Sequence, residues 1–247
     1  MKRLIIVTAI LGTLAQGTTR AGWLDVLLGN KSTNQPAGSS IAALSQEQVI
    51  SALKEALGKG VEHAVSTLGT TNGFLSDLRV KIPVPEPLQK VERSLRLLGQ
   101  DKLADDFIAT MNHAAEQAVP QAASVLGNAV QQMTLADAKA ILTSTNTAAT
   151  EFFRRTSSTN LYARFYPIVA KATQAVGVTS AYKNMMDKAG FASAFLGDKV
   201  GDLDAYVTQK SLDGLFLKIA DEEKRIRENP VARTTDLLQK VFGAIQR

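Results

Sequence analysis

From Ser45 onward, apolar residues recur at intervals of three and four, the period of an α-helix, and no run alternates apolar and polar residues as a strand would. The first such stretch opens with a capping-box pattern at Ser45 and Gln48. Its apolar stripe comprises Val49, Ile50, Leu53, Leu57, Ala64 and Leu68. Gly60 falls on the same stripe, which favours a close helix crossing there. The pattern predicts an all-α fold.

Similar periodicity continues to the C-terminus and predicts a compact array of roughly eight helices in one domain, residues 45–247. Two of the predicted helices run from Asp101 to Ala118 and from Leu203 to Glu228. AATEFFRRT is expected to form a separate short helix, before another from Leu161 to Val176 with an interruption or kink at Pro167.

A proline-rich segment, DLRVKIPVPEPL, interrupts the helical pattern. Prolines 83, 85 and 87 stand at alternate positions and impose an extended path. We predict a strap that packs Ile82 and Val84 against the core; a recognition segment is the alternative.

Residues 1–21 have the pattern of a cleaved secretory signal peptide. Lys2 and Arg3 precede about twelve apolar residues, fewer than the ~20 that cross a hydrocarbon core, and Thr19 to Ala21 form a cleavage site. Residues 22–44 follow as an apolar cluster around Trp23 and a flexible linker. The expected location is the periplasm.

Composition excludes several classes of function. Removal of residues 1–21 leaves 25 basic and 23 acidic residues, so the charge gives no support for nucleic-acid binding. With no cysteine, the chain has neither disulfides nor a thiol nucleophile. No common catalytic, cofactor or metal motif occurs, and we expect no cofactor and no metal. Both histidines, His63 and His113, are predicted on solvent-facing flanks, and His113 with Glu116 as a surface pair.

The most informative charged segment is ADEEKRIRENPVARTTDLLQKVFG, residues 220–243. Glu223 falls about 35° from the centre of its helix's apolar stripe, so its carboxylate should be at least half buried. Arg227 lies one turn later, in the favourable order for an ion pair, and Arg233 is a second candidate partner. With Glu222 these residues form a candidate cluster that is either a structural ion-pair network or the lining of a functional cavity.

Six segments together resemble a family of exported bacterial proteins known as domain of unknown function 4197, over about Leu44 to Gly243. They are SALKEALGKGVEHAV, DLRVKIPVPEPL, FIATMNHAAEQAV, DAKAILTSTNTAATEFF, LDAYVTQKSLDGLF and IADEEKRIRENPVARTTDLLQKVFG. The resemblance implies an exported helical domain and supplies no reaction, ligand or catalytic residue.

Three kinds of function remain open. A non-enzymatic binding or scaffold protein would act through contacts with another envelope protein or with itself. The alternatives are a carrier of a small apolar ligand or lipid, and a hydrolase-type enzyme whose acid, base and anion clamp come from the Glu222, Glu223, Arg227 and Arg233 cluster. An apolar pocket would favour the carrier, a charged cleft the enzyme, and a solid core with exposed apolar side chains the protein partner.

Overall fold

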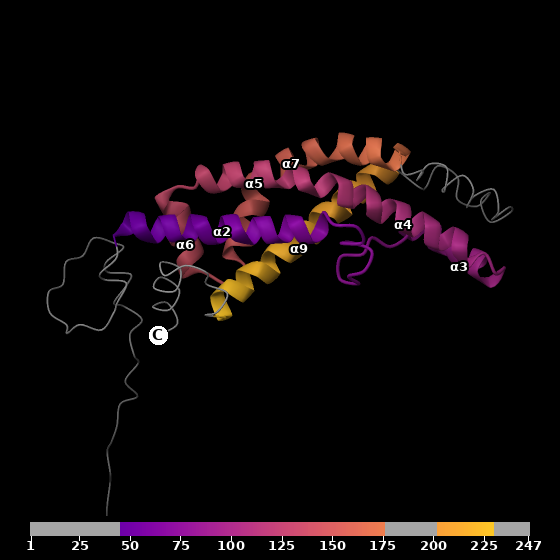
Figure 1. Ribbon diagram of the computed structural model, residues 1–247, viewed down its shortest axis with the longest axis horizontal. Coiled ribbons are helices and arrows are strands. Elements are labelled where there is room, and N and C mark those ends of the chain that lie inside the picture. The colour runs from indigo at the N-terminus through magenta and orange to yellow at the C-terminus, as the bar shows by residue number, and fades with distance from the viewer. Residues whose placement is uncertain (1–44, 176–201, 230–247) are drawn as a thin grey trace, which may run out of the picture.

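The computed structural model describes residues 45–175 and 202–229, which form an all-α structure with no strand among them (Figure 1). The α-helices are α2 (Gln46–Leu68), α3 (Gln89–Leu97), α4 (Asp101–Ala118), α5 (Ala122–Gln131), α6 (Leu135–Thr143), α7 (Ala148–Ala175) and α9 (Leu203–Glu228). Short 3-10 turns, η2 (Glu86–Leu88) and η3 (Val119–Gln121), precede α3 and α5. The all-α prediction is confirmed, although the helix count differs in detail from eight. The proposed signal peptide, the Trp23 segment and residues 176–201 and 230–247 of the predicted domain lie outside the described residues.

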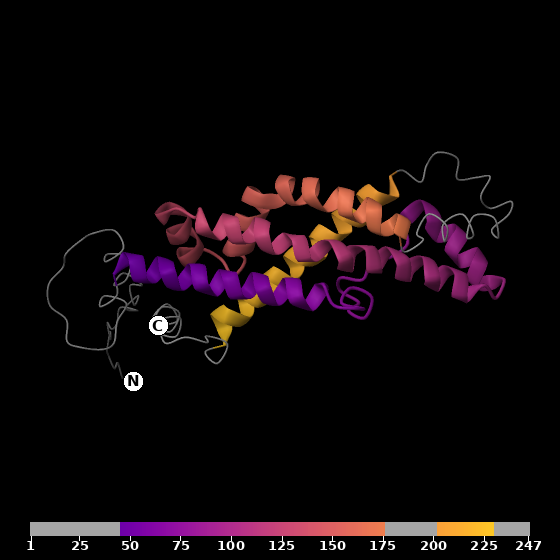
Figure 2. The same ribbon diagram turned by 45° about the horizontal axis from the view of Figure 1, so that its top comes forward.

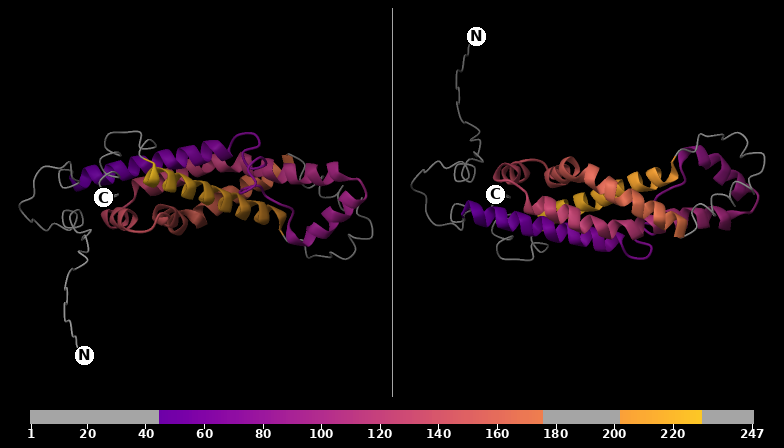
Figure 3. Two further views of the ribbon diagram at one scale, coloured as in Figure 1. Left: turned by 90° about the horizontal axis from the view of Figure 1, so that it is seen from below. Right: turned by 90° about the horizontal axis from the view of Figure 1, so that it is seen from above.

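The helices form an elongated bundle that α9 crosses obliquely (Figures 1 and 2). α9 packs against α7, α2 and α4, while α5 packs against α2 and α7. The hairpin of α3 and α4 extends to one end of the molecule, away from α6 (Figure 3). One continuous core joins these elements, and its largest fully buried side chains include Phe74, Phe107, Phe153, Phe165 and Phe216.

The proline-rich strap packs as the sequence predicts, with Ile82 and Val84 buried. Asn112 of α4, itself fully buried, holds the strap with its side-chain amide. Its Oδ1 accepts from the Ile82 N–H at 2.8 Å, and its Nδ2 donates to the Ile82 carbonyl at 3.0 Å. A second donation to the Ile108 carbonyl fixes the amide on its own helix. This amide thereby replaces the strand partner that an extended segment in an all-α protein lacks.

The region from Ala148 to Ala175 corrects the sequence prediction. A single helix, α7, replaces the two that were expected, and Pro167 lies inside it. Proline removes one intrahelical hydrogen bond, and the packing of Phe165 and Val169 in the core holds the helix across that position.

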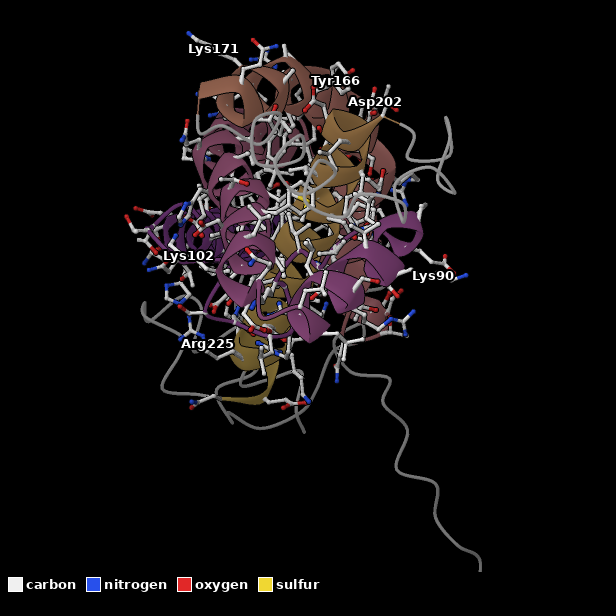
Figure 4. The ribbon with its side chains drawn as sticks, turned by 90° about the vertical axis from the view of Figure 1, so that its right-hand side faces the viewer. Lys90, Lys102, Tyr166, Lys171, Asp202 and Arg225 are labelled. Carbon is white, nitrogen blue, oxygen red and sulfur yellow. The ribbon has the colours of Figure 1, made fainter. Side chains whose placement is uncertain are left out.

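The C-terminal half of α7 is joined to the start of α9 by two hydroxyl-to-carboxylate hydrogen bonds. Tyr166 and Asp202 lie beside each other, and the Tyr166 hydroxyl donates to Asp202 at 2.7 Å (Figure 4). Thr173 donates to Asp204, also at 2.7 Å. Asp202 is the N-cap of α9, and the N–H of Ala205, followed by the Tyr166 hydroxyl, lowers the pKa of its carboxyl.

Two buried glycines on different helices provide a matched stability test. Gly60 lies where α2 packs against α9, but a Cβ there would lie 3.6 Å from Cβ of Glu222, an ordinary contact, so the crossing is not close enough to require glycine. A Cβ at Gly214 would lie 2.7 Å from the Phe74 ring. We expect Gly60→Ala to raise the free energy of unfolding by up to about 1 kcal/mol, since alanine favours the helix. The free energy of unfolding of Gly214→Ala should be about 1–3 kcal/mol lower than that of Gly60→Ala, because the added methyl group would overpack the core against Phe74.

Chemical denaturation of both glycine variants measures this difference. Equal stabilisation by the two substitutions would contradict the close approach of α9 to Phe74.

Candidate functional site

Glu223 lies on the buried face of α9, with 6% of its surface exposed. Its carboxylate reaches the first turn of α7. One oxygen accepts from the Ala149 N–H at 2.9 Å, and the other accepts from the N–H and the hydroxyl of Thr150, both at 2.9 Å. The first N–H groups of a helix have no partner within the helix, so this carboxylate acts as their cap from another helix.

Arg227, one turn along α9, completes the interaction. Its Nη2 and Nε lie 2.8 and 3.1 Å from Oε1 of Glu223, as the sequence spacing predicts. The same Nη2 donates to the carbonyl of Ile141 in the last turn of α6 at 2.8 Å. The pair therefore connects the end of α6, the start of α7 and the body of α9.

The charges of the pair match the helix ends that they contact. The carboxylate lies at the N-terminus of α7, which carries a partial positive charge, and the guanidinium lies at the C-terminus of α6, which carries a partial negative charge. Both contacts are therefore electrostatically favourable. Burial of the pair is compensated by five hydrogen bonds to the Glu223 oxygens. A general base needs a free lone pair directed at a substrate, and these bonds occupy the carboxylate with structural donors.

The space beside Glu223 and Arg227 is too small for a substrate. The adjoining cavity, whose apolar lining includes Leu53, Leu57 and Ile226, has a volume of about 20 Å³. That is room for about one water molecule, whereas ligand pockets measure about 300–1,000 Å³. The arrangement is that of a structural junction, and we call Glu223 and Arg227 the helix-end junction.

Glu222 belongs to a neighbouring contact. It is 8% exposed and accepts from Nε of Arg225 at 2.9 Å, while Nε2 of His63 on α2 lies 3.4 Å from its other oxygen. His63 is exposed, as predicted. The structure thus places Glu222 beside Glu223 on α9 but gives it different partners. Arg233, the other predicted member of the cluster, lies outside the described residues.

Glu116 corrects the expectation of a surface pair with His113. Its side chain is buried, with 6% exposed, and accepts from the N–H groups of Asn72 and Phe74 at 3.1 and 3.2 Å. His113 contacts Asn72, at 3.4 Å, in the same turn. Glu116 thus fixes the turn after α2, where Asn72 has a positive φ of 64°.

Neither a metal centre nor a membrane span is found in the ranges 45–175 and 202–229. No three acidic or histidine side chains there are grouped so as to hold a metal ion. No helix in these ranges is both long enough and apolar enough to cross a bilayer.

The tip of the α3–α4 hairpin carries a feature that sequence reasoning missed. Leu97 is 88% exposed and Leu98 is 66% exposed, next to Gly99, whose φ of 69° forms the turn. Val91 and Leu95 define the buried face of α3, and Leu97 lies about 200° from Leu95 around the helix. That phase difference was the available signal. We call Leu97 and Leu98 the hairpin tip.

The comparisons with known proteins give one family. Residues 43–243 match the model of the family described as protein of unknown function (DUF4197), and the chain belongs to this family. Searches among curated proteins and among solved structures gave no match.

Proposed function

We propose that this member of the family is a non-enzymatic binding or scaffold protein of the bacterial periplasm, and that the hairpin tip contacts a partner protein. The partner is another envelope protein or a second copy of the chain. The observation that carries the proposal is the exposure of Leu97 and Leu98 on a projecting hairpin. Contiguous exposed apolar side chains mark protein contacts more often than single ones do, and Leu97 and Leu98 are adjacent in the chain.

The hairpin tip is held rigidly, which favours binding because little conformational freedom is lost. Arg96 pairs with Glu92 of its own helix at 3.0 Å and with Asp105 of α4 at 2.8 Å. Gln100 N–H donates to the Leu95 carbonyl at 2.8 Å and closes the turn. The two leucines are therefore presented on a fixed support.

The charges around the hairpin tip favour a protein over an anionic surface. Figure 4 looks onto this end, where Lys90 and Lys102 point outward on opposite sides. Lys102 is paired with Asp106 at 2.7 Å, and Arg96 with the carboxylates of α3 and α4. The surface around the hairpin tip therefore carries charges of both signs. It lacks the clustered basic side chains that bind nucleic acids or anionic lipids.

The geometry of the helix-end junction supports a catalytic role less than it supports a structural one. The Glu223 carboxylate has five structural donors and the cavity beside it holds about 20 Å³. The same small volume offers an apolar ligand no room at this junction.

Export by a cleaved signal peptide is part of the proposal and has a direct test. The intact mass of the protein recovered from its own periplasm should correspond to a chain that begins at Gly22. A mass that includes Met1 would contradict both cleavage and the proposed location.

Native mass spectrometry of the protein purified from its own periplasm tests the partner. We expect a protein complex that is lost in the Leu97→Ser/Leu98→Ser variant. Leu135→Ser is the control, because Leu135 is an exposed leucine on a different helix, α6. Circular dichroism should show that all the variants keep their helical content. A stoichiometric small ligand without any protein partner would overturn the proposal.

A further inference from the structure

A second cavity lies between α5, the first turn of α6 and α7, separate from the helix-end junction. Its volume is about 280 Å³. The rim carries the exposed side chains of Asn128, Gln132 and Asn160, and the buried Ser157 and Phe152 lie deeper. This volume is just below the range of drug-sized ligand pockets, about 300–1,000 Å³, and suits a smaller ligand of about one sugar ring.

The amides at the rim are available to a ligand. Among the residues that the structure describes, the side chains of Asn128 and Gln132 make no hydrogen bond, and Asn160 uses only its Oδ1, to accept from Arg164. Asn128 lies in the last turn of α5, and Gln132, four residues later, is the C-cap of α5 with helical backbone angles, so both side chains lie on the same face. Each primary amide offers a carbonyl acceptor and two N–H donors.

The charge in the cavity is balanced. Asp137 lines it, but one carboxylate oxygen accepts from the Thr134 hydroxyl at 2.6 Å and the other from Arg155 at 3.3 Å. The Thr134 hydrogen bond is the main cause of the lowered pKa of Asp137, so this carboxyl is ionised and paired near neutral pH. A charged ligand would find no unpaired opposite charge on these groups.

Apolar side chains complete the lining. Val125, Ala129 and Phe152 lie among the polar groups, and Phe152 and Val125 are also part of the core, which fixes their positions. Hydroxyl groups both donate and accept, as amides do, whereas the C–H faces of a sugar ring are apolar. A compact, neutral, hydroxyl-rich molecule therefore matches both kinds of lining, while an extended peptide would need a longer groove.

We propose that this cavity, with Asn128, Gln132 and Asn160 as its hydrogen-bonding residues, binds a neutral sugar of about one ring. The site is independent of the hairpin tip and goes beyond the proposed protein contact. A ligand of this size, held by a few hydrogen bonds at an open site, is expected to bind with a Kd of about 1 mM.

Titration followed by ¹H–¹⁵N NMR of the mature full-length protein tests this site. The probes are glucose and N-acetylglucosamine, with glucose 6-phosphate as the charged comparison. We expect the neutral sugars to shift resonances from Val125 to Gln132 and from Phe152 to Asn160. Glucose 6-phosphate should bind more weakly than glucose.

A pair of double variants assigns the binding to these amides. Asn128→Ala/Gln132→Ala removes two exposed side chains and should weaken sugar binding at least tenfold. Gln117→Ala/Gln121→Ala removes two exposed amides outside the cavity and should leave binding unchanged. The inference is overturned if neither neutral sugar shifts the cavity resonances, if the first double variant binds as the wild type does, or if glucose 6-phosphate binds more tightly than glucose.

Discussion

Glu223→Ala is expected to lower the free energy of unfolding by about 3 kcal/mol, because it leaves Arg227 without its carboxylate partner and exposes two first-turn N–H groups of α7 without an acceptor. For a chain of this size, the corresponding decrease in Tm is about 6–12 °C. Thermal and urea unfolding of the purified protein measure the effect.

Two further variants separate the role of the Glu223 charge from that of its hydrogen bonds. Glu223→Gln keeps a side-chain oxygen that can accept from the α7 N–H groups, so it should cost less than the alanine variant. Glu62→Ala removes an exposed carboxylate from α2 and should change stability by less than about 0.5 kcal/mol. An unchanged Tm in Glu223→Ala would contradict the structural role and reopen the catalytic one.

Asn112→Ala is the second substitution with a large expected effect. The substitution removes the fully buried side-chain amide that makes both hydrogen bonds to the Ile82 backbone. The N–H and the carbonyl of Ile82 are then left without a partner. Each unsatisfied buried group costs about 1–3 kcal/mol, so we expect a total loss of about 3 kcal/mol. Urea denaturation measures it, and hydrogen exchange of the Ile82 amide should accelerate beyond the change in global stability.

Asn146→Ala provides the matched control for Asn112→Ala, since Asn146 is exposed in the turn before α7. Its stability should stay within about 0.5 kcal/mol of the wild type. Equal stabilities of the two alanine variants would contradict the proposed role of Asn112 in holding the strap.

Local sequence patterns predicted much of the fold. The expected bounds of α4 and α9 agree with the structure, because each helix carries one long apolar stripe. The strap was predictable for a different reason: prolines at alternate positions exclude a helix. The single helix α7 was not predictable in the same way, since Pro167 is a local signal against a helix, and tertiary packing overrides it.

The candidate site was predictable only where its contacts are local. Spacing within α9 identified the Glu223 and Arg227 pair, which the structure joins at 2.8 Å. The contacts to Ala149, Thr150 and Ile141 lie more than 70 residues away in the sequence, so helix phase gives no information about them. Buried Glu116 was missed for the same reason, because its partners are in the turn after α2.

Site-specific photo-crosslinking in cells of the source organism tests the central functional claim most directly. A photoreactive residue at position 97, on the hairpin tip, should give one dominant crosslinked species, and the same residue at position 135, on α6, should not. A dominant species that contains either another envelope protein or a second copy of the chain is the predicted result. Absence of any protein crosslink at position 97, or the same products at both positions, would contradict the account.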